Sequence, residues 1–158
     1  MLDLSRTLIN VIDIWDTDEI PFTDISKGSI ELIKQDMCEF SKFLSTKLDS
    51  YRKQGAHINI AMHHHSPNPY FTFLSENKNE LTYIEQSDLL EEYMNKNNLT
   101  QLIICGAHLF KCISSRSTGY DNMKKIIPNT KIAITLSRAL PQDAFEVSTY
   151  PSADLVYL

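Results

Sequence analysis

Apolar positions along the chain follow two alternating patterns. The first pattern consists of short runs that are apolar on both faces and rich in β-branched residues, which is typical of strands buried in a parallel sheet. The runs are Thr7–Ile14, His57–His63, Gln101–Gly106 and Lys131–Leu136. A shorter run at Ala153–Leu158 predicts a fifth strand.

The second pattern places apolar residues three or four positions apart, which predicts amphipathic helices. The longest such segment is Ser29–Gln54, and Gly55 supplies its stop. Its apolar stripe consists of Ile30, Ile33, Met37, Phe40, Leu44, Leu48 and Tyr51. Two further helices are predicted at Ser87–Asn97 and at Lys111–Ile126, although Gly119 weakens the second.

Strands and helices therefore alternate, with acidic or polar loops at Trp15–Gly28 and after the second strand. This order predicts an α/β fold, with a mostly parallel sheet between two layers of helices and right-handed crossovers. The length of 158 residues fits one domain spanning 1–158. Ligands of such folds bind at the carboxyl ends of the strands, where Asp13, a histidine run and Gly106 fall.

Composition narrows the function classes. The net charge of -5 argues against a nucleic-acid partner and, more weakly, against anionic membranes. No apolar run approaches the roughly 20 residues of a membrane span, and no signal peptide is evident. The odd count of three cysteines then predicts reduced thiols and a cytoplasmic protein. We expect a small-molecule partner and leave homo-oligomer formation open.

Cys112 is the first candidate for chemistry. It follows Gly106 at the predicted start of a helix, where unpaired backbone N–H groups and the helix dipole favour a thiolate. The alternative is a small buried apolar residue, which is what most free cysteines are. Cys38, on the long helix, and Cys105, inside a strand, are predicted to be structural.

Asp13 is the second candidate, because a carboxylate in an apolar strand is costly to bury without a partner. It is either a general base or a strand-ending residue that caps the next turn. Lys78, taken alone in its polar loop, is predicted to be solvated surface.

The histidine run is the third candidate. If the second strand continues, His63 and His65 share a face and, with Asp13, compose a two-histidine, one-carboxylate metal site. The preferred interpretation is a polar edge that binds no metal.

Taken together, three segments resemble the isochorismatase-like cysteine hydrolases, the group that includes nicotinamidases. Residues 8–13 (LINVID) resemble the first strand with its catalytic aspartate. Residues 78–84 (KNELTYI), followed by Ser87-Asp88-Leu89, resemble the lysine segment and the helix after it. Residues 102–106 (LIICG), followed after five residues by Cys112, resemble the nucleophile segment. The match covers roughly residues 7–136, in the family's order of Asp, Lys and Cys.

The resemblance implies a cysteine-dependent hydrolase of a small amide, with no cofactor. Asp13 would be the base, Lys78 would orient it, and Cys112 would be the nucleophile. The backbone N–H groups of His108 and Cys112 would form the oxyanion hole, shaped by a cis peptide bond between Ala107 and His108.

Some residues depart from the family pattern. Trp15 follows the aspartate where the family has a polar segment, and Leu109 replaces a threonine. The family's metal-binding aspartate is missing, and the segment after the fourth strand is short. Trp15, His65 and Leu109 are expected to line the substrate pocket. The same departures favour a rival function, an inactive relative that serves as a binding or assembly module.

Overall fold

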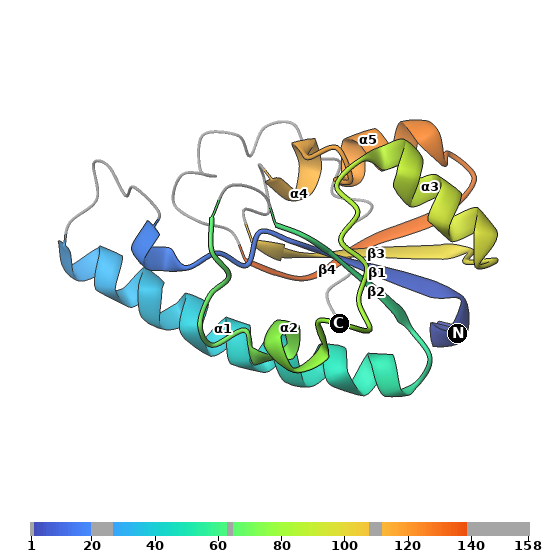
Figure 1. Cartoon of the computed structure of the whole chain (residues 1–158). Coiled ribbons are helices and arrows are strands. Elements are labelled where there is room, and N and C mark those ends of the chain that lie inside the picture. Colours follow the sequence, from blue (N-terminus) through green and yellow to red (C-terminus); the bar gives the residue numbers. More distant parts are fainter. Residues whose placement is uncertain (1, 20–26, 63–64, 108–111, 139–158) are drawn as a thin grey trace.

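The chain folds around one parallel sheet. The computed structural model describes residues 2–19, 27–62, 65–107 and 112–138. Within them the strands are β1 (Thr7–Ile12), β2 (His57–Ala61), β3 (Gln101–Ala107) and β4 (Lys131–Arg138). All neighbours pair in parallel, in the order β2-β1-β3-β4 (Figure 1). The four runs predicted to be neighbouring strands are therefore confirmed.

Helices cover both faces of this sheet, as predicted for a three-layer α/β fold. Figure 1 shows α1 (Lys27–Lys53) and α2 (Thr72–Asn77) on one face. On the other face lie α3 (Ser87–Lys96), α4 (Cys112–Ser115) and α5 (Tyr120–Ile126). Two short 3-10 helices, Leu4–Arg6 and Thr17–Glu19, flank β1.

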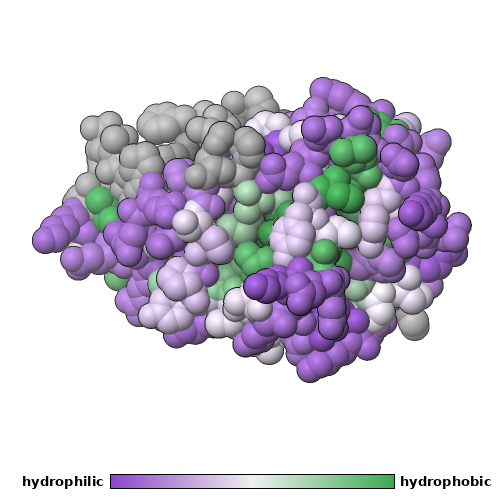
Figure 2. Space-filling view, in the orientation of Figure 1, coloured by the Kyte–Doolittle hydropathy of each residue, from purple (hydrophilic) through white to green (hydrophobic). Residues whose placement is uncertain are grey.

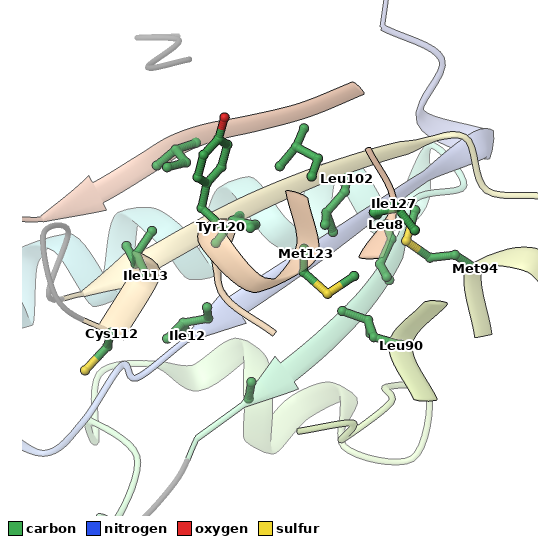
Figure 3. Close-up of a cluster of buried hydrophobic side chains, with 14 of the residues drawn as sticks. Leu8, Ile12, Leu90, Met94, Leu102, Cys112, Ile113, Tyr120, Met123 and Ile127 are labelled. Atoms are coloured by element: carbon green, nitrogen blue, oxygen red, sulfur yellow. The ribbon is translucent and has the colours of Figure 1, made fainter. Parts of the chain in front are cut away.

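Each face of the sheet has its own apolar core, which explains why the strand sequences are apolar throughout. All six residues of β1 are buried. Leu8 and Ile12 pack under α3, α4 and α5, in the cluster that Figure 3 shows. Ile9 and Val11 point to the opposite core, under α1 and α2. Each such fully buried aliphatic side chain contributes about 2 kcal/mol through removal of its surface from water.

The structure differs from the sequence prediction at several boundaries: β2 ends at Ala61 rather than His63, and β4 continues to Arg138 rather than Leu136. The first strand ends at Ile12 rather than Ile14, because Asp13 has a left-handed backbone with φ of 52°. The helix predicted at Lys111–Ile126 is divided into α4 and α5, since Gly119 has an extended backbone and is the N-cap of α5. A short helix, α2, interrupts the predicted polar loop because its Phe73 is buried in the core under α1. The predicted strand at Ala153–Leu158 lies outside the described residues.

The surface in the view of Figure 2 is mostly hydrophilic over α1, α2 and α3. Apolar surface gathers between α2 below and α3 and α5 above. No helix in the described part of the chain is both long and apolar enough to cross a lipid bilayer.

Candidate active site

Asp13 lies where β1 ends, and its side chain is completely buried. Its backbone N–H donates to the Ala61 carbonyl at the end of β2 over 3.2 Å. The left-handed backbone at Asp13 ends the regular extension of β1, and aspartate tolerates this conformation better than most residues. A buried carboxylate is thereby fixed at the carboxyl edge of the sheet.

Gly106, on the neighbouring strand, allows β1 and β3 to approach closely beside Asp13. It pairs with Ile12 and has a positive φ of 130°. A Cβ atom at this position would lie 1.9 Å from the Ile12 carbonyl oxygen. Only glycine therefore fits here, so this residue sets the strand spacing directly behind the candidate site.

Cys112, at the start of α4, and Arg116, in the turn just after α4, both reach Asp13. Cys112 begins this helix, and the Arg116 N–H donates to the Cys112 carbonyl over 3.1 Å, which closes a helical turn. The Arg116 Nε atom donates to Asp13 Oδ2 over 2.8 Å. The Cys112 thiol lies close enough to both Asp13 and Arg116 for their charges to act on its pKa. Figure 3 shows Cys112 at the edge of the apolar cluster, near Ile12 and Ile113.

The environment of Cys112 keeps its thiol neutral. Burial is the largest cause, followed by the charge and hydrogen bond of Asp13, and together they raise the thiol pKa to about 12 although Arg116 opposes them. The sequence-based expectation of a thiolate is therefore wrong for the free protein. The expected helix is cut to four residues, so it has little dipole to offset burial beside a carboxylate.

Arg116 is held as a cation. Burial alone would lower its pKa, but the charge and hydrogen bond of Asp13, with a contribution from Cys112, outweigh burial and raise the pKa. The guanidinium therefore stays charged and compensates the buried carboxylate.

Lys78 does not join this group, contrary to the expectation from the resemblance. It caps the carboxyl end of α2 and is exposed. Its neighbour Glu80 pairs with Arg52, near the end of α1 and close to where β2 begins. The following residues then run parallel to β2, toward the edge where Asp13 lies. Lys78 thus precedes this parallel segment, and it makes no hydrogen bond or ion pair with Asp13, Cys112 or Arg116 in the described part of the chain.

Trp15 and His65, two of the expected pocket residues, lie next to the charged group. The Arg116 guanidinium carbon is 5.6 Å from the centre of the Trp15 ring. His65 meets the same ring edge-on with 4.5 Å between centroids, and its Nδ1 lies 3.5 Å from Glu19 Oε2. An aromatic wall thus flanks Arg116, and a cation over an indole face is a favourable contact.

A small cavity opens beside Arg116. Its volume is about 170 Å³. That is smaller than the 300–1,000 Å³ typical of pockets for drug-sized ligands. Its lining residues come from the end of β2, the segment before α3 and the turn after α4: Ala61, Glu85, Arg116, Ser117 and Thr118.

Several expected site residues lie outside the described part of the chain: His63, His108, Leu109 and the Ala107–His108 bond. The oxyanion hole and the metal alternative at His63 and His65 thus stay predictions. Among the described residues, no three His, Cys, Asp or Glu side chains gather as metal ligands would.

Arg116 was not singled out from the sequence, although a local signal exists. It follows Cys112 by four positions in a segment predicted to be helical. Residues four apart lie on the same side of a helix, so the spacing alone predicts that Arg116 lies beside Cys112.

Comparison with known proteins finds a similar fold but no similar sequence. No protein-family model and no curated protein sequence matches the chain. Among solved structures, an isochorismatase from Pseudomonas putida superposes with a TM-score of 0.57 at 14% sequence identity. The match covers 99% of this chain and 89% of that one. The order of elements, the parallel sheet and this superposition together identify the fold of the chain as isochorismatase-like.

Proposed function

We propose that this protein is a cysteine-dependent hydrolase of a small amide, with Cys112 as nucleophile, Asp13 as general base and Arg116 as their cation. The observation that carries the proposal is the ion pair between a completely buried Asp13 and Arg116, which lies beside the Cys112 thiol and acts on its pKa. A nucleophile, a base and a cation therefore lie together at the carboxyl edge of a parallel sheet, and nucleophilic acyl transfer needs these groups.

In the first half of the reaction, the carboxylate of Asp13 takes the proton from the Cys112 sulfur. The sulfur electron pair forms a bond to the amide carbon, and the carbonyl π electrons move to its oxygen. When this tetrahedral intermediate collapses, the C–N bond breaks and the nitrogen takes the proton back from Asp13. The amine or ammonia leaves, and a thioester on Cys112 remains.

In the second half, water replaces the amine. Asp13 takes a proton from water, whose oxygen attacks the thioester carbon. The C–S bond then breaks, the carboxylic acid leaves, and Asp13 returns the proton to the Cys112 sulfur. One amide and one water thus give one acid and one amine. The backbone N–H groups of Cys112 and His108 remain our proposed oxyanion donors.

A thiol pKa of about 12 fits this assignment of Asp13. A thiol that is neutral at pH 7 must lose its proton as the C–S bond forms, so it needs a base within hydrogen-bond reach. Asp13 has that position. Arg116 keeps one positive charge beside the pair while the proton moves, which limits the cost of charge separation in a buried site.

The cavity supports a small substrate. It offers a guanidinium from Arg116, a carboxylate from Glu85 and hydroxyls from Ser117 and Thr118. The volume of about 170 Å³ suits a compact amide, whose carbonyl and N–H groups can hydrogen-bond with these polar side chains.

The test is a panel of small carboxamides, followed by release of ammonia or amine. We expect turnover in the wild type and in Cys38→Ala, and none in Cys112→Ala. A thioester adduct on Cys112 should appear in mass spectra of acid-quenched samples. Turnover that survives in purified Cys112→Ala would refute the assignment of the nucleophile.

A second candidate function is a binding module that uses the same cavity without turnover. The position of Lys78, exposed at the end of α2 and without an interaction with Asp13 or Cys112, favours it. In that case the amides or the matching acids would raise the unfolding temperature of wild type and Cys112→Ala equally, and no product would form.

A further inference from the structure

Two asparagines lie side by side within an otherwise apolar face of the sheet. Asn10 of β1 is in register with Asn59 of β2, and both are completely buried. The neighbours of Asn10 on the same face, Leu8 and Ile12, belong to the apolar cluster under α3, α4 and α5. Burial of amide groups here is costly unless each is hydrogen-bonded.

Asn10 reaches the turn that follows α4. Its Nδ2 atom donates to the Thr118 carbonyl over 2.9 Å, although 108 positions separate the two residues. Its Oδ1 atom accepts from Asn59 Nδ2 over 2.7 Å. Asn10 therefore connects the turn carrying Arg116, Ser117 and Thr118 to its partner asparagine.

Asn59 reaches the segment that precedes α3. Its Nδ2 atom donates to the Ile84 carbonyl over 2.9 Å, and its Oδ1 atom accepts from the Ile84 N–H over 2.8 Å. The Thr82 hydroxyl also donates to Oδ1 over 2.9 Å. With the bond to Asn10, both donors and both acceptor positions of the Asn59 amide are in use.

The two tethered segments are the two walls of the cavity. Thr118 lines it directly, as do Arg116 and Ser117 from the same turn. Glu85, on the opposite wall, follows Ile84 immediately. A fully hydrogen-bonded network in a dry core fixes geometry more tightly than isolated bonds do.

We propose that Asn10 and Asn59 are positioning residues that join the buried side of these two walls through an amide bridge and so hold Arg116 against Asp13. The bridge adds to the exposed hydrogen bond from the Ser87 N–H to the Ser117 hydroxyl, which joins the same walls over 3.1 Å. The proposal deepens the proposed function, because Arg116 is the cation assigned there. It predicts that disturbing either asparagine loosens both walls, including the one that the altered residue does not touch.

The experiment is backbone hydrogen exchange in Asn10→Leu and Asn59→Leu. Two amides report on the walls: Ile84, which donates to Asn59, and Gly119, which donates to the Arg116 carbonyl. We expect exchange to quicken about tenfold at both amides in both variants, relative to amides of α2. The informative amides are the remote ones, Ile84 in Asn10→Leu and Gly119 in Asn59→Leu.

Asn77→Leu is the matched control. Asn77 is also buried and donates from Nδ2 to a backbone carbonyl, that of Phe73, but it belongs to α2 on the other face. This variant should leave Ile84 and Gly119 unchanged. If the leucine variants do not fold, Asn10→Thr and Asn59→Thr serve the same comparison. Faster exchange confined to the wall that each altered residue touches, or equal to that in Asn77→Leu, would overturn the bridge.

A second measurement links the bridge to Arg116. The described charged groups that face the Cys112 thiol are Asp13 and Arg116. If Arg116 moves away, alkylation of Cys112 by iodoacetamide should slow about threefold or more at pH 9 in both leucine variants and not in Asn77→Leu. An unchanged rate would refute the link to Arg116. Neither readout needs a substrate, so an absence of amide turnover in the wild type would count against the proposed function alone.

Discussion

Arg116 donates from Nε to Oδ2 of Asp13 across 2.8 Å, and the carboxylate that accepts is completely buried. The two residues are 103 positions apart in the chain. Their ion pair therefore ties α4 to the end of β1 and gives a buried negative charge its compensation. Removal of one partner from such a pair leaves an uncompensated charge in the interior.

Arg116→Gln should lower the free energy of unfolding by about 3 kcal/mol, because the completely buried carboxylate of Asp13 then lacks its cation. Arg52→Gln is the matched control. Arg52 pairs with Glu80 at the surface, where the glutamate side chain is 63% exposed. Its loss should cost at most about 1 kcal/mol. Urea unfolding measures both, and equal losses would contradict the structural difference.

Alkylation of Cys112 should respond in opposite directions to its two charged neighbours. Asp13 raises the thiol pKa and Arg116 lowers it. Asp13→Asn should therefore make Cys112 react faster with iodoacetamide at pH 9 than it does in the wild type, and Arg116→Gln should make it react more slowly. Lys78→Ala is the control and should have no effect, because Lys78 is exposed at the end of α2 and is not among the charged groups that act on the Cys112 thiol. Peptide mass spectrometry after timed quenching gives the rate at each cysteine.

The raised pKa of Cys112 also changes the expected order in which the cysteines are alkylated. The sequence alone led us to expect Cys112 to be the most reactive thiol at neutral pH. A pKa of about 12 keeps it protonated there. Burial raises the pKa of Cys38 as well, but this residue is only partly buried and so is open to the reagent. In the free protein at pH 8 we now expect Cys38 to be alkylated before Cys112. If Cys112 reacts first, its pKa in the folded protein is lower than about 12.

The strands were predictable because burial on both faces leaves a direct mark on the sequence. The ends of the helices were harder to predict because they depend on local steric contacts, as at Gly119. A Cβ atom there would lie 2.7 Å from the Ile113 carbonyl and 2.8 Å from the Ser114 carbonyl. The chain therefore turns at this glycine, which separates α4 from α5 and places Arg116 in the turn.

The site was predictable where it rests on strand ends and not where it rests on loops. Asp13 and Cys112 meet because parallel strands bring their carboxyl ends to one edge. The position of Lys78 depends on whether the polar segment after β2 forms a helix. Phe71 and Phe73 pack into the core under α1 and stabilise α2 there. Lys78 caps this helix and so does not reach the carboxyl edge of the sheet. Sequence order alone cannot reveal this.

Stability should fall at alkaline pH because of Cys112. Its folded pKa of about 12 lies above the ordinary thiol value of 9.0, so above pH 9 the unfolded state loses this proton first. Unfolding then becomes more favourable as pH rises from about 9 to 12. By pH 10.5 the wild type should have lost about 2 kcal/mol more than Cys112→Ala, relative to pH 8. Urea unfolding across this range measures the difference, and parallel pH profiles would contradict the raised pKa.

Gly106→Ala should be among the most damaging single changes in the described residues. The added Cβ would lie 1.9 Å from the Ile12 carbonyl oxygen, on a residue whose φ is 130°. Steric overlap and backbone strain should together cost at least about 3 kcal/mol, because β1 and β3 must separate. Gly28→Ala is the control, since nothing lies within 4 Å of its added Cβ in α1. That change should be neutral or stabilise by up to about 1 kcal/mol, because alanine favours helix. Urea unfolding measures both changes, and a Gly106→Ala protein as stable as the wild type would contradict the close approach of the strands. Separation of β1 and β3 would also displace Asp13, so any Gly106→Ala protein that folds should show an altered rate of Cys112 alkylation, while Gly28→Ala should react at the wild-type rate.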